Sequence, residues 1–300
     1  MTKKLKADLL LLIITIVWGS SFPLMKIMLD FMPSFAYLSL RFLLAAIILT
    51  VIFHKNLKHF SRRTFFFGCV IGIFMFAGMA LQVNGLYTTS ASNSGFITGL
   101  NVVMVPMISA VLLKKKPDRA SVLGVGIAFA GLLLVSGGLN MNFNFGDFLT
   151  FLSSICWALQ IIFIDKFTAT EDASLLAIMQ IGFTGVVSTG VWMSIGFQQF
   201  EFNGTVILVL LITAVLGTAL AFGGQTIAQK DTSPTHTALI FTAEPVFAAL
   251  FAMIIPNMAG ETESLGLTSA IGSALILAGM LVSELKLGRK RPKQQDQYAG

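Results

Sequence analysis

The sequence predicts an all-helical integral membrane protein of ten spanning helices, arranged as two inverted halves of five. Three observations predict this fold class: an apolar composition, apolar runs that recur along the whole chain, and an internal repeat. Of the 300 residues, 55% are hydrophobic and only 11% are charged, whereas a soluble domain has roughly 25% charged residues. A surface with so few charges suits lipid better than water.

The apolar runs have the length of membrane-spanning helices, which need about 20 mostly apolar residues. The first run follows three lysines, as a signal peptide would, but it continues uncharged from Leu9 to Met25 without an A-x-A-like cleavage site. We therefore expect it to be retained as a span. No connection between runs is long enough for a soluble domain. The ten predicted spans are residues 7–29, 34–53, 65–87, 91–113, 119–137, 147–165, 174–197, 204–228, 235–255 and 266–285.

The basic residues predict how the spans are oriented. With the N-terminus in the cytoplasm, all but two of the 20 Lys and Arg residues fall in cytoplasmic segments, and the outer loops carry acidic residues instead. The exceptions are Lys26 and Arg41, within or at the edge of spans. This distribution follows the positive-inside rule and predicts two cytoplasmic termini and an inner-membrane location, as in bacteria. It also explains the net charge of +6 without a nucleic-acid partner.

An internal repeat relates the two halves of the chain. The segment DLLLLIITIVW, residues 8–18, matches DFLTFLSSICW, residues 147–157, at an offset of 139 residues. Because each half contains five spans, an odd number, the second half enters the membrane from the opposite side. We expect residues 1–138 to form the first half, 139–285 the second half, and 286–300 a disordered basic tail. Inverted halves of this kind are a recurring basis for alternating access. The same offset relates Arg41 to Gln180, Gly78 to Gly217, Gly85 to Gly224 and Pro106 to Pro245.

Several motifs resemble those of the EamA-like branch of the drug/metabolite transporter superfamily. They are WGSSFP at 18–23, TSASNSGFITGLNVVMVPMISAVL at 89–112, TALIFTAEPVFAALFAMII at 237–255, and the glycine pattern of the fifth and tenth spans. The resemblance covers nearly the whole chain. It implies a 5+5 helical fold with a central cavity, and export of amino acids, metabolites or drugs. One departure is that the family's Gly-Glu pair after the ninth span aligns with Gly260-Glu261 only after a shift.

The WGSSFP stretch contains poor helix formers in the middle of the first span. Pro23 cannot donate to the carbonyl of Gly19, and its ring crowds that turn. We expect a kink or a short unwound stretch, which would cost several kcal/mol facing lipid but little beside a polar cavity. The stretch either lines a site, which we favour, or lets two helices approach closely. The predicted helix breaks are Gly19, Pro23, Pro106 and Pro245.

Uncharged polar residues and tryptophans are predicted to surround a modest polar site in mid-bilayer. Taken singly, each is as readily explained by a helix–helix hydrogen bond. The candidates for binding a substrate are Trp18, Ser20, Ser21, Asn84, Asn101, Trp157, Gln160 and Gln225.

Two charged residues fall inside the predicted spans. An ionised Glu244 at the bilayer centre would cost roughly 2.5–3.5 kcal/mol, so it either carries a proton for coupled export or has a structural role beside Pro245. Its repeat position at the 139-residue offset is Val105. Arg41 lies about 10 Å deep, at 1.5 Å per residue, and either holds a substrate carboxylate or pairs with Asp30, which we favour.

The remaining motifs exclude several classes of function. The two cysteines lie in apolar runs, and two of the three histidines share one cytoplasmic loop, so neither a disulfide framework nor a metal site is predicted. No nucleophile or nucleotide-binding motif is present, and we expect neither enzymatic activity nor a cofactor.

The predicted function is secondary transport that exports a small organic solute, by uniport or by proton exchange, as a monomer or homodimer. One alternative is an antiporter of phosphorylated sugars or nucleotide sugars, which would need more basic residues deep in the membrane. Another is a lipid-handling intramembrane protein, which would need paired catalytic groups there.

Overall fold

The computed structural model describes residues 2–112, 114, 119–135, 144–256, 260, 262 and 266–284, and every regular element among them is helical. The predicted tail, residues 286–300, lies outside the described residues. The helices are α1 Lys3–Leu29, α2 Ser34–Ile52, η1 His54–His59, α3 Arg62–Gly85, α4 Ala91–Gly99, α5 Asn101–Leu112, α6 Arg119–Val135, α7 Phe145–Thr168, α8 Ala173–Ser194, α9 Gly204–Ala214, η2 Val215–Leu220, α10 Ala221–Gln229, α11 Pro234–Phe241, α12 Glu244–Ala252 and α13 Leu267–Glu284.

Eight helical segments are long and apolar enough to cross a membrane. In this count α4 with α5, α9 with η2 and α10, and α11 with α12 each form one segment. Two shorter apolar helices, Arg119–Leu134 and Ala270–Gly279, lie within α6 and α13. The chain is thus a multi-pass, all-helical membrane protein with eight to ten candidate spans.

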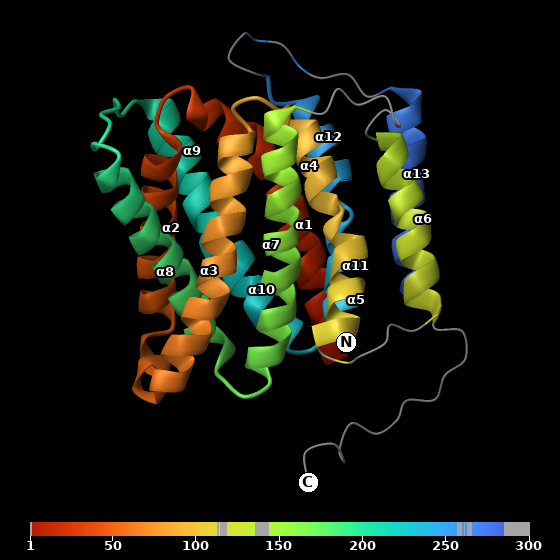
Figure 1. Cartoon of the computed structure of the whole chain (residues 1–300), viewed down its shortest axis with the longest axis horizontal. Helices are drawn as coiled ribbons and strands as arrows, with labels where there is room; N and C mark the ends of the chain where they lie inside the picture. The colour runs from red at the N-terminus through yellow and green to blue at the C-terminus, as the bar shows by residue number, and fades with distance from the viewer. Residues whose placement is uncertain are drawn as a thin grey trace.

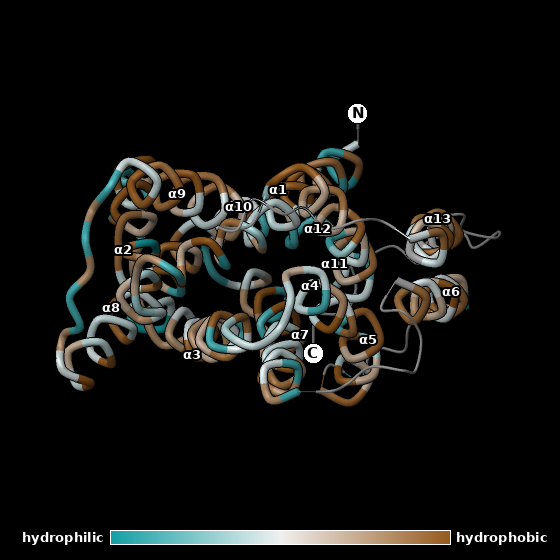
Figure 2. Tube along the Cα trace, turned by 90° about the horizontal axis from the view of Figure 1, so that it is seen from above, coloured by the Kyte–Doolittle hydropathy of each residue, from teal (hydrophilic) through white to brown (hydrophobic). Residues whose placement is uncertain are grey.

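The helices stand side by side in a bundle (Figure 1). Seen from above, most of them enclose a central region, while α6 and α13 lie at one end of the bundle (Figure 2). These two helices pack closely on each other, because a Cβ added at Gly131 would lie 2.5 Å from the carbonyl oxygen of Gly272. A Cβ added at Gly279 would likewise lie 2.6 Å from the carbonyl oxygen of Gly124.

The first helix of each half runs in the opposite direction. α1 begins at the lower edge of the bundle and α7 at the upper edge (Figure 1). Asp8 lies near the start of α1 and Asp147 near the start of α7, so these two acidic residues lie at opposite ends of the bundle.

The breaks in the helices differ from those predicted. α1 is helical without interruption from Lys3 to Leu29, through both Gly19 and Pro23. A Cβ on Gly19 would lie 2.5 Å from Cβ of Phe247 on α12, so this glycine allows close helix packing instead of unwinding α1. The prediction of an unwound stretch in the first span was therefore wrong, whereas the alternative of a kink at Pro23 stays a prediction.

The fourth and ninth spans are the ones that break. The fourth is interrupted at Leu100, and Pro106 lies inside the continuous α5, so the break predicted at Pro106 was wrong. The ninth is interrupted at Thr242 and Ala243, directly before α12, where Pro245 occupies one of the first two helical positions. Proline is tolerated there because its missing N–H would have no partner within the helix.

The two halves match at two different offsets. Helices α2 and α8 begin at residues 34 and 173, which preserves the 139-residue offset. Ser90 and Ser233 cap α4 and α11 in the same way, each accepting a backbone N–H three residues later, and their offset is 143 residues. The difference arises because α8 has 22 residues against 19 in α2 and because η2, a π-helical turn, lengthens the eighth span.

Candidate solute-binding cavity

A partly open cavity lies among α1, α2, α3, α4, α5, α7, α10, α11 and α12, and its empty space, counted together with the open solvent at its mouth, is about 480 Å³. Six of the eight predicted substrate-binding residues line it, together with both predicted charged residues. These are Trp18, Ser21, Asn101, Trp157, Gln160 and Gln225, with Arg41 and Glu244.

Ser20 and Asn84 do not line the cavity. Ser20 is not on the face of α1 that carries Trp18 and Ser21. Its hydroxyl donates to the carbonyl of Val17 in the same helix at 2.7 Å. Asn84 donates to the carbonyl of Ala80 at 2.7 Å and accepts from Ser34 at 3.1 Å. Both side chains are engaged in helix contacts away from the cavity.

The lining is arranged in matched pairs from the two halves. Trp18 and Trp157 are paired at the 139-residue offset. Gln82 and Gln225 are paired at the 143-residue offset. Gln82 and its hydrogen-bond partner Thr98 also line the cavity and were not among the predicted substrate-binding residues, although Gln82 is visible in the sequence as a polar residue within the third span.

A third pair of lining residues, Asn101 and Glu244, changes which residue of the first half corresponds to Glu244. Asn101 is the first residue of α5 and Glu244 the first residue of α12, at an offset of 143 residues. The equivalent of the buried acid is thus Asn101, and the assignment to Val105 was wrong. Each of the two residues follows the break in its span.

A chain of buried amides crosses the second half. Gln225 donates to Gln160 at 3.1 Å, Gln160 donates to Gln180 at 3.1 Å, and Gln180 donates to Thr226 at 2.6 Å. These bonds connect α7, α8 and α10. A network whose groups are satisfied makes the cavity wall rigid.

The π-helical turn η2 supplies a carbonyl acceptor behind the cavity. The carbonyl of Gly217 accepts the indole N–H of Trp18 at 3.1 Å and Nη2 of Arg41 at 3.2 Å. A Cβ on Gly217 would lie 3.1 Å from Oγ of Ser21, so a side chain there would crowd α1. π-Helical turns of this kind occur often at functional sites.

Arg41 is held by protein groups and not by Asp30. Its Nε donates to Thr218 at 2.6 Å and its Nη1 to Tyr37 at 3.1 Å, while the rings of Tyr37 and Phe42 lie 5.7 and 5.6 Å from its Cζ. Asp30 is exposed, and no carboxylate in the described part of the chain lies within ion-pair distance of Arg41. The predicted pairing was wrong because Arg41 turns into the bundle, where η2 offers oxygen acceptors.

Three polar groups of the cavity lining have no hydrogen-bond partner among the described residues. They are the indole N–H of Trp157, Oδ1 of Asn101 and the carboxylate of Glu244, on residues exposed by only 7%, 4% and 7%. Buried polar groups are nearly always hydrogen-bonded. These groups therefore need water or a solute in the cavity.

Aromatic rings form much of the apolar wall. The ring of Trp18 lies 4.8 Å from Phe222 and 4.9 Å from Phe241, and Trp157 stacks on Phe222 at 5.6 Å. Phe222 therefore contacts the tryptophans of both halves. The other apolar lining residues are Phe22, Met25, Met79 and Ile161.

Polar contacts join helices at each end of the bundle. Near the start of α7, Asp147 accepts a hydrogen bond at 2.5 Å from the hydroxyl of Thr89, a residue that lies just before α4. We call this contact clasp A. Near the start of α1, Asp8 lies 3.2 Å from Nε2 of His236 on α11 and also pairs with Lys4; this contact is clasp B. The acidic residues of the two clasps are repeat partners.

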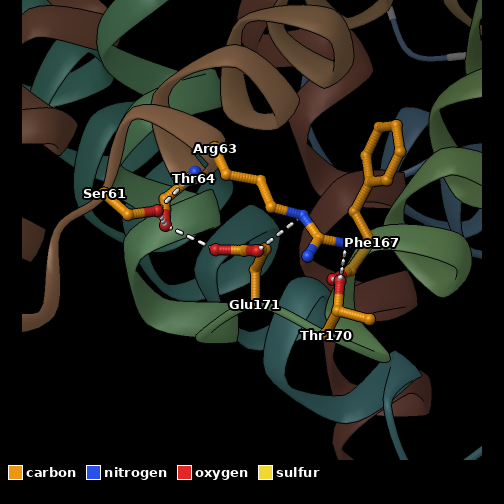
Figure 3. A network of polar contacts seen from close by, with 6 residues as sticks. All are labelled: Ser61, Arg63, Thr64, Phe167, Thr170 and Glu171. Carbon is orange, nitrogen blue, oxygen red and sulfur yellow. Dashed lines mark hydrogen bonds and ion pairs between the residues drawn. The ribbon is translucent and has the colours of Figure 1, made fainter.

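A second network joins the two halves at the same end of the bundle as clasp B (Figure 3). Glu171, after α7, accepts from Thr64 at 2.6 Å and pairs with Arg63 at 3.2 Å, both at the start of α3. The guanidinium of Arg63 also donates to Thr170 at 3.3 Å. Because Arg63 has a 60% exposed side chain, its ion pair contributes little energy by itself.

A membrane-spanning helical bundle with a partly polar cavity between matched halves is the architecture of a solute transporter. Comparison with known sequences identifies its family. The profile of the EamA-like transporter family matches residues 5–137 and 144–285, and the chain belongs to this family of the drug/metabolite transporter superfamily. The two matched stretches suggest a repeat.

Relatives cover nearly the full length of the chain. An uncharacterized transporter of Archaeoglobus fulgidus is 35% identical, with 95% of this chain and 88% of that protein covered. The uncharacterized transporter YyaM of Bacillus subtilis is 26% identical over 98% of this chain and 99% of its own. The uncharacterized inner membrane transporter YedA of Escherichia coli is 24% identical over 89% and 87%. A crystal structure with 17% identity shares the fold at a TM-score of 0.73, covering 93% of this chain and 98% of that one.

Proposed function

We propose that the chain exports small organic solutes by alternating access, as a secondary transporter of the inner membrane with both termini in the cytoplasm. The observation that carries the proposal is the cavity, where matched residues of two oppositely directed halves surround polar groups without partners. Inverted halves can exchange conformations, so that one arrangement opens inward and its mirror image outward.

The clasps support this mechanism. Asp8 and Trp18 are ten positions apart on α1, as are Asp147 and Trp157 on α7, which places each clasp about 15 Å along the helix from the cavity at 1.5 Å per residue. Since α1 and α7 run in opposite directions (Figure 1), the two clasps lie on opposite sides of the solute. Breaking one while keeping the other would open the cavity to one side only.

Two features bear on the alternatives. Arg41 is the one basic side chain among the described residues that line the cavity, and η2 already holds it, which disfavours phosphorylated or nucleotide sugars. Glu244 lines the cavity without a protein partner, which makes it the candidate for proton coupling.

The test is solute counterflow in proteoliposomes with amino acids, amines and neutral amphiphiles, with and without a pH gradient. Gln225→Ala, which removes a lining amide, is expected to lower transport at least tenfold. The control Phe66→Ala changes a 62% exposed side chain facing away from the bundle and should retain transport. Equal loss in both variants, or flux equal to empty liposomes for every solute, would contradict the proposal.

A further inference from the structure

We propose that clasp B is a proton-binding site that closes the cytoplasmic side of the cavity in acid. His236 takes the proton, and its charged ring then holds Asp8 and keeps the inner ends of α1 and α11 together. This inference rests on the proposed alternating access. It adds a regulating ligand, the proton, about 15 Å along α1 from the cavity.

The contact in clasp B depends on charge. Oδ1 of Asp8 and Nε2 of His236 are 3.2 Å apart, but the two atoms are not aligned as a hydrogen bond. Their side chains are exposed by only 17% and 11%, so solvent screens the attraction incompletely. An imidazole changes its charge between about pH 5 and 8. The contact is therefore expected to strengthen as the pH falls through this range.

Lys4 leaves one oxygen of Asp8 to His236. Its Nζ lies 3.5 Å from Oδ2, whereas His236 lies beside Oδ1. The other charged groups come from the inner ends of elements packed against α11 and from the connections there. They are Lys3 and Lys6 on α1, Lys114 after α5, Arg119 on α6, Asp165 and Lys166 on α7, and Lys230 and Asp231 before α11. None of these is a histidine, the side chain whose charge ordinarily changes near neutral pH.

Buried polar groups close to His236 in the chain favour water at this gate. Oε1 of Gln229 and the hydroxyls of Thr232 and Thr237 have no hydrogen-bond partner among the described residues. Gln229 and Thr237 are exposed by only 1% and 0%. Buried groups of this kind usually bind internal water. Water held around the turn between α10 and α11 would carry a proton from the cytoplasm to His236.

The partners of the acidic residue in clasp A are neutral instead. Asp147 accepts from the hydroxyl of Thr89 and, at 2.9 Å, from the backbone N–H of Asn144. Neither donor changes its charge with pH, although Asp8 and Asp147 are repeat partners. The proton therefore acts on one side only, where acid favours closure towards the cytoplasm.

Access to the cavity measures this gate without requiring transport. The full-length protein would carry Met79→Cys in the cavity lining, with Cys69 and Cys156 replaced by serine. A membrane-impermeant maleimide is applied from the cytoplasmic side to inside-out vesicles and from the outer side to right-side-out vesicles. The ratio of the two alkylation rates cancels the pH dependence of the thiol itself. We expect the inner-to-outer ratio to rise severalfold from about pH 5.5 to about pH 8.

Variants assign the effect to His236. His236→Gln removes the charge and should give a high ratio at every pH, whereas His236→Lys keeps a positive charge and should give a low one. His59→Gln is the matched control, because His59 is exposed in η1 at the same end of the bundle, and it should retain the pH dependence. Size-exclusion profiles and Tm values would show that each variant is folded.

A wild-type ratio that stays constant with pH would overturn the proposal. So would a pH dependence that His236→Gln retains or that His59→Gln removes. Failure of the transport function is distinguishable, because no solute would then give counterflow above empty liposomes while the labelling ratio still followed the pH.

Discussion

Trp18 on α1 donates its indole N–H to the carbonyl of Gly217 in η2 across 3.1 Å, and Nη2 of Arg41 donates to the same oxygen at 3.2 Å. This one carbonyl therefore joins α1, α2 and the eighth span behind the cavity. A π-helical turn is energetically poorer than an α-helical one, and here side-chain donors from two other helices stabilise it.

Replacing Trp18 with Phe tests this relationship. A six-membered aromatic ring is kept, but the hydrogen bond and the packing of the smaller indole ring are lost. We therefore expect a loss in stability of at least about 0.5–1.5 kcal/mol, the usual value of the hydrogen bond alone. Thermal unfolding in detergent measures it as a lower Tm. Trp192→Phe is the matched control, because its indole N–H bonds to the carbonyl of Gln198 in the α8–α9 connection at 3.3 Å. An unchanged Tm in Trp18→Phe would show that η2 does not depend on this hydrogen bond.

Gly19→Ala tests the close packing of α1 on α12. The added Cβ would lie 2.5 Å from Cβ of Phe247 and 2.9 Å from the backbone nitrogen of Ala248, so one helix must shift. We expect a destabilisation of about 1–3 kcal/mol, typical of overpacking. Gly190→Ala, with nothing within 4 Å of its added Cβ, should be neutral or stabilising. If both variants unfolded at the wild-type temperature, the predicted contact would not exist.

The clasps are expected to control access from opposite sides. With the native cysteines removed, a cysteine replacing Met79 in the cavity reports access by its rate of alkylation. Asp8→Asn should raise the rate for a membrane-impermeant reagent on the side where α1 begins, and Asp147→Asn on the other side. We expect increases of severalfold. If either variant raised labelling equally from both sides, or neither changed it, the clasps would not act as gates.

Asp172 lies in the connection between α7 and α8, and we expect it to cause a loss of stability in acid. Burial raises the pKa of Asp172, but hydrogen bonds from Ser174, the Leu175 backbone and Asn56 outweigh burial and hold the pKa below its usual 3.8. Since the folded-state pKa is lowered, this stabilisation is fully present above about pH 4 and is lost as the pH falls through the folded-state value. Asp172→Asn should flatten the pH dependence of Tm below pH 4. A variant whose Tm falls with acid as steeply as wild type would refute this assignment.

The proposed orientation predicts where fused reporters are active. Alkaline phosphatase is active only outside the cytoplasm, and green fluorescent protein fluoresces inside it. We expect phosphatase activity after Asn203, between α8 and α9, and fluorescence after Lys58, between α2 and α3. The reverse pattern would place both termini outside.

The sequence alone determined the chemistry of the spans. Twenty-residue apolar runs become helices in lipid because each backbone group must find its hydrogen-bond partner locally. The polar residues of those runs were also visible, and Trp18, Asn101, Trp157 and Gln225 do line a common cavity.

Only the tertiary structure decided which face of each helix meets the cavity and how the halves align. Those choices depend on packing between segments that are far apart in sequence, such as Gly19 against Phe247 and Arg41 against η2. The longer α8 and the π-helical turn η2 together shift the repeat from 139 to 143 residues. That shift makes Asn101 the partner of Glu244. A periodic apolar pattern cannot express it, because lipid-facing and helix-facing positions are equally apolar.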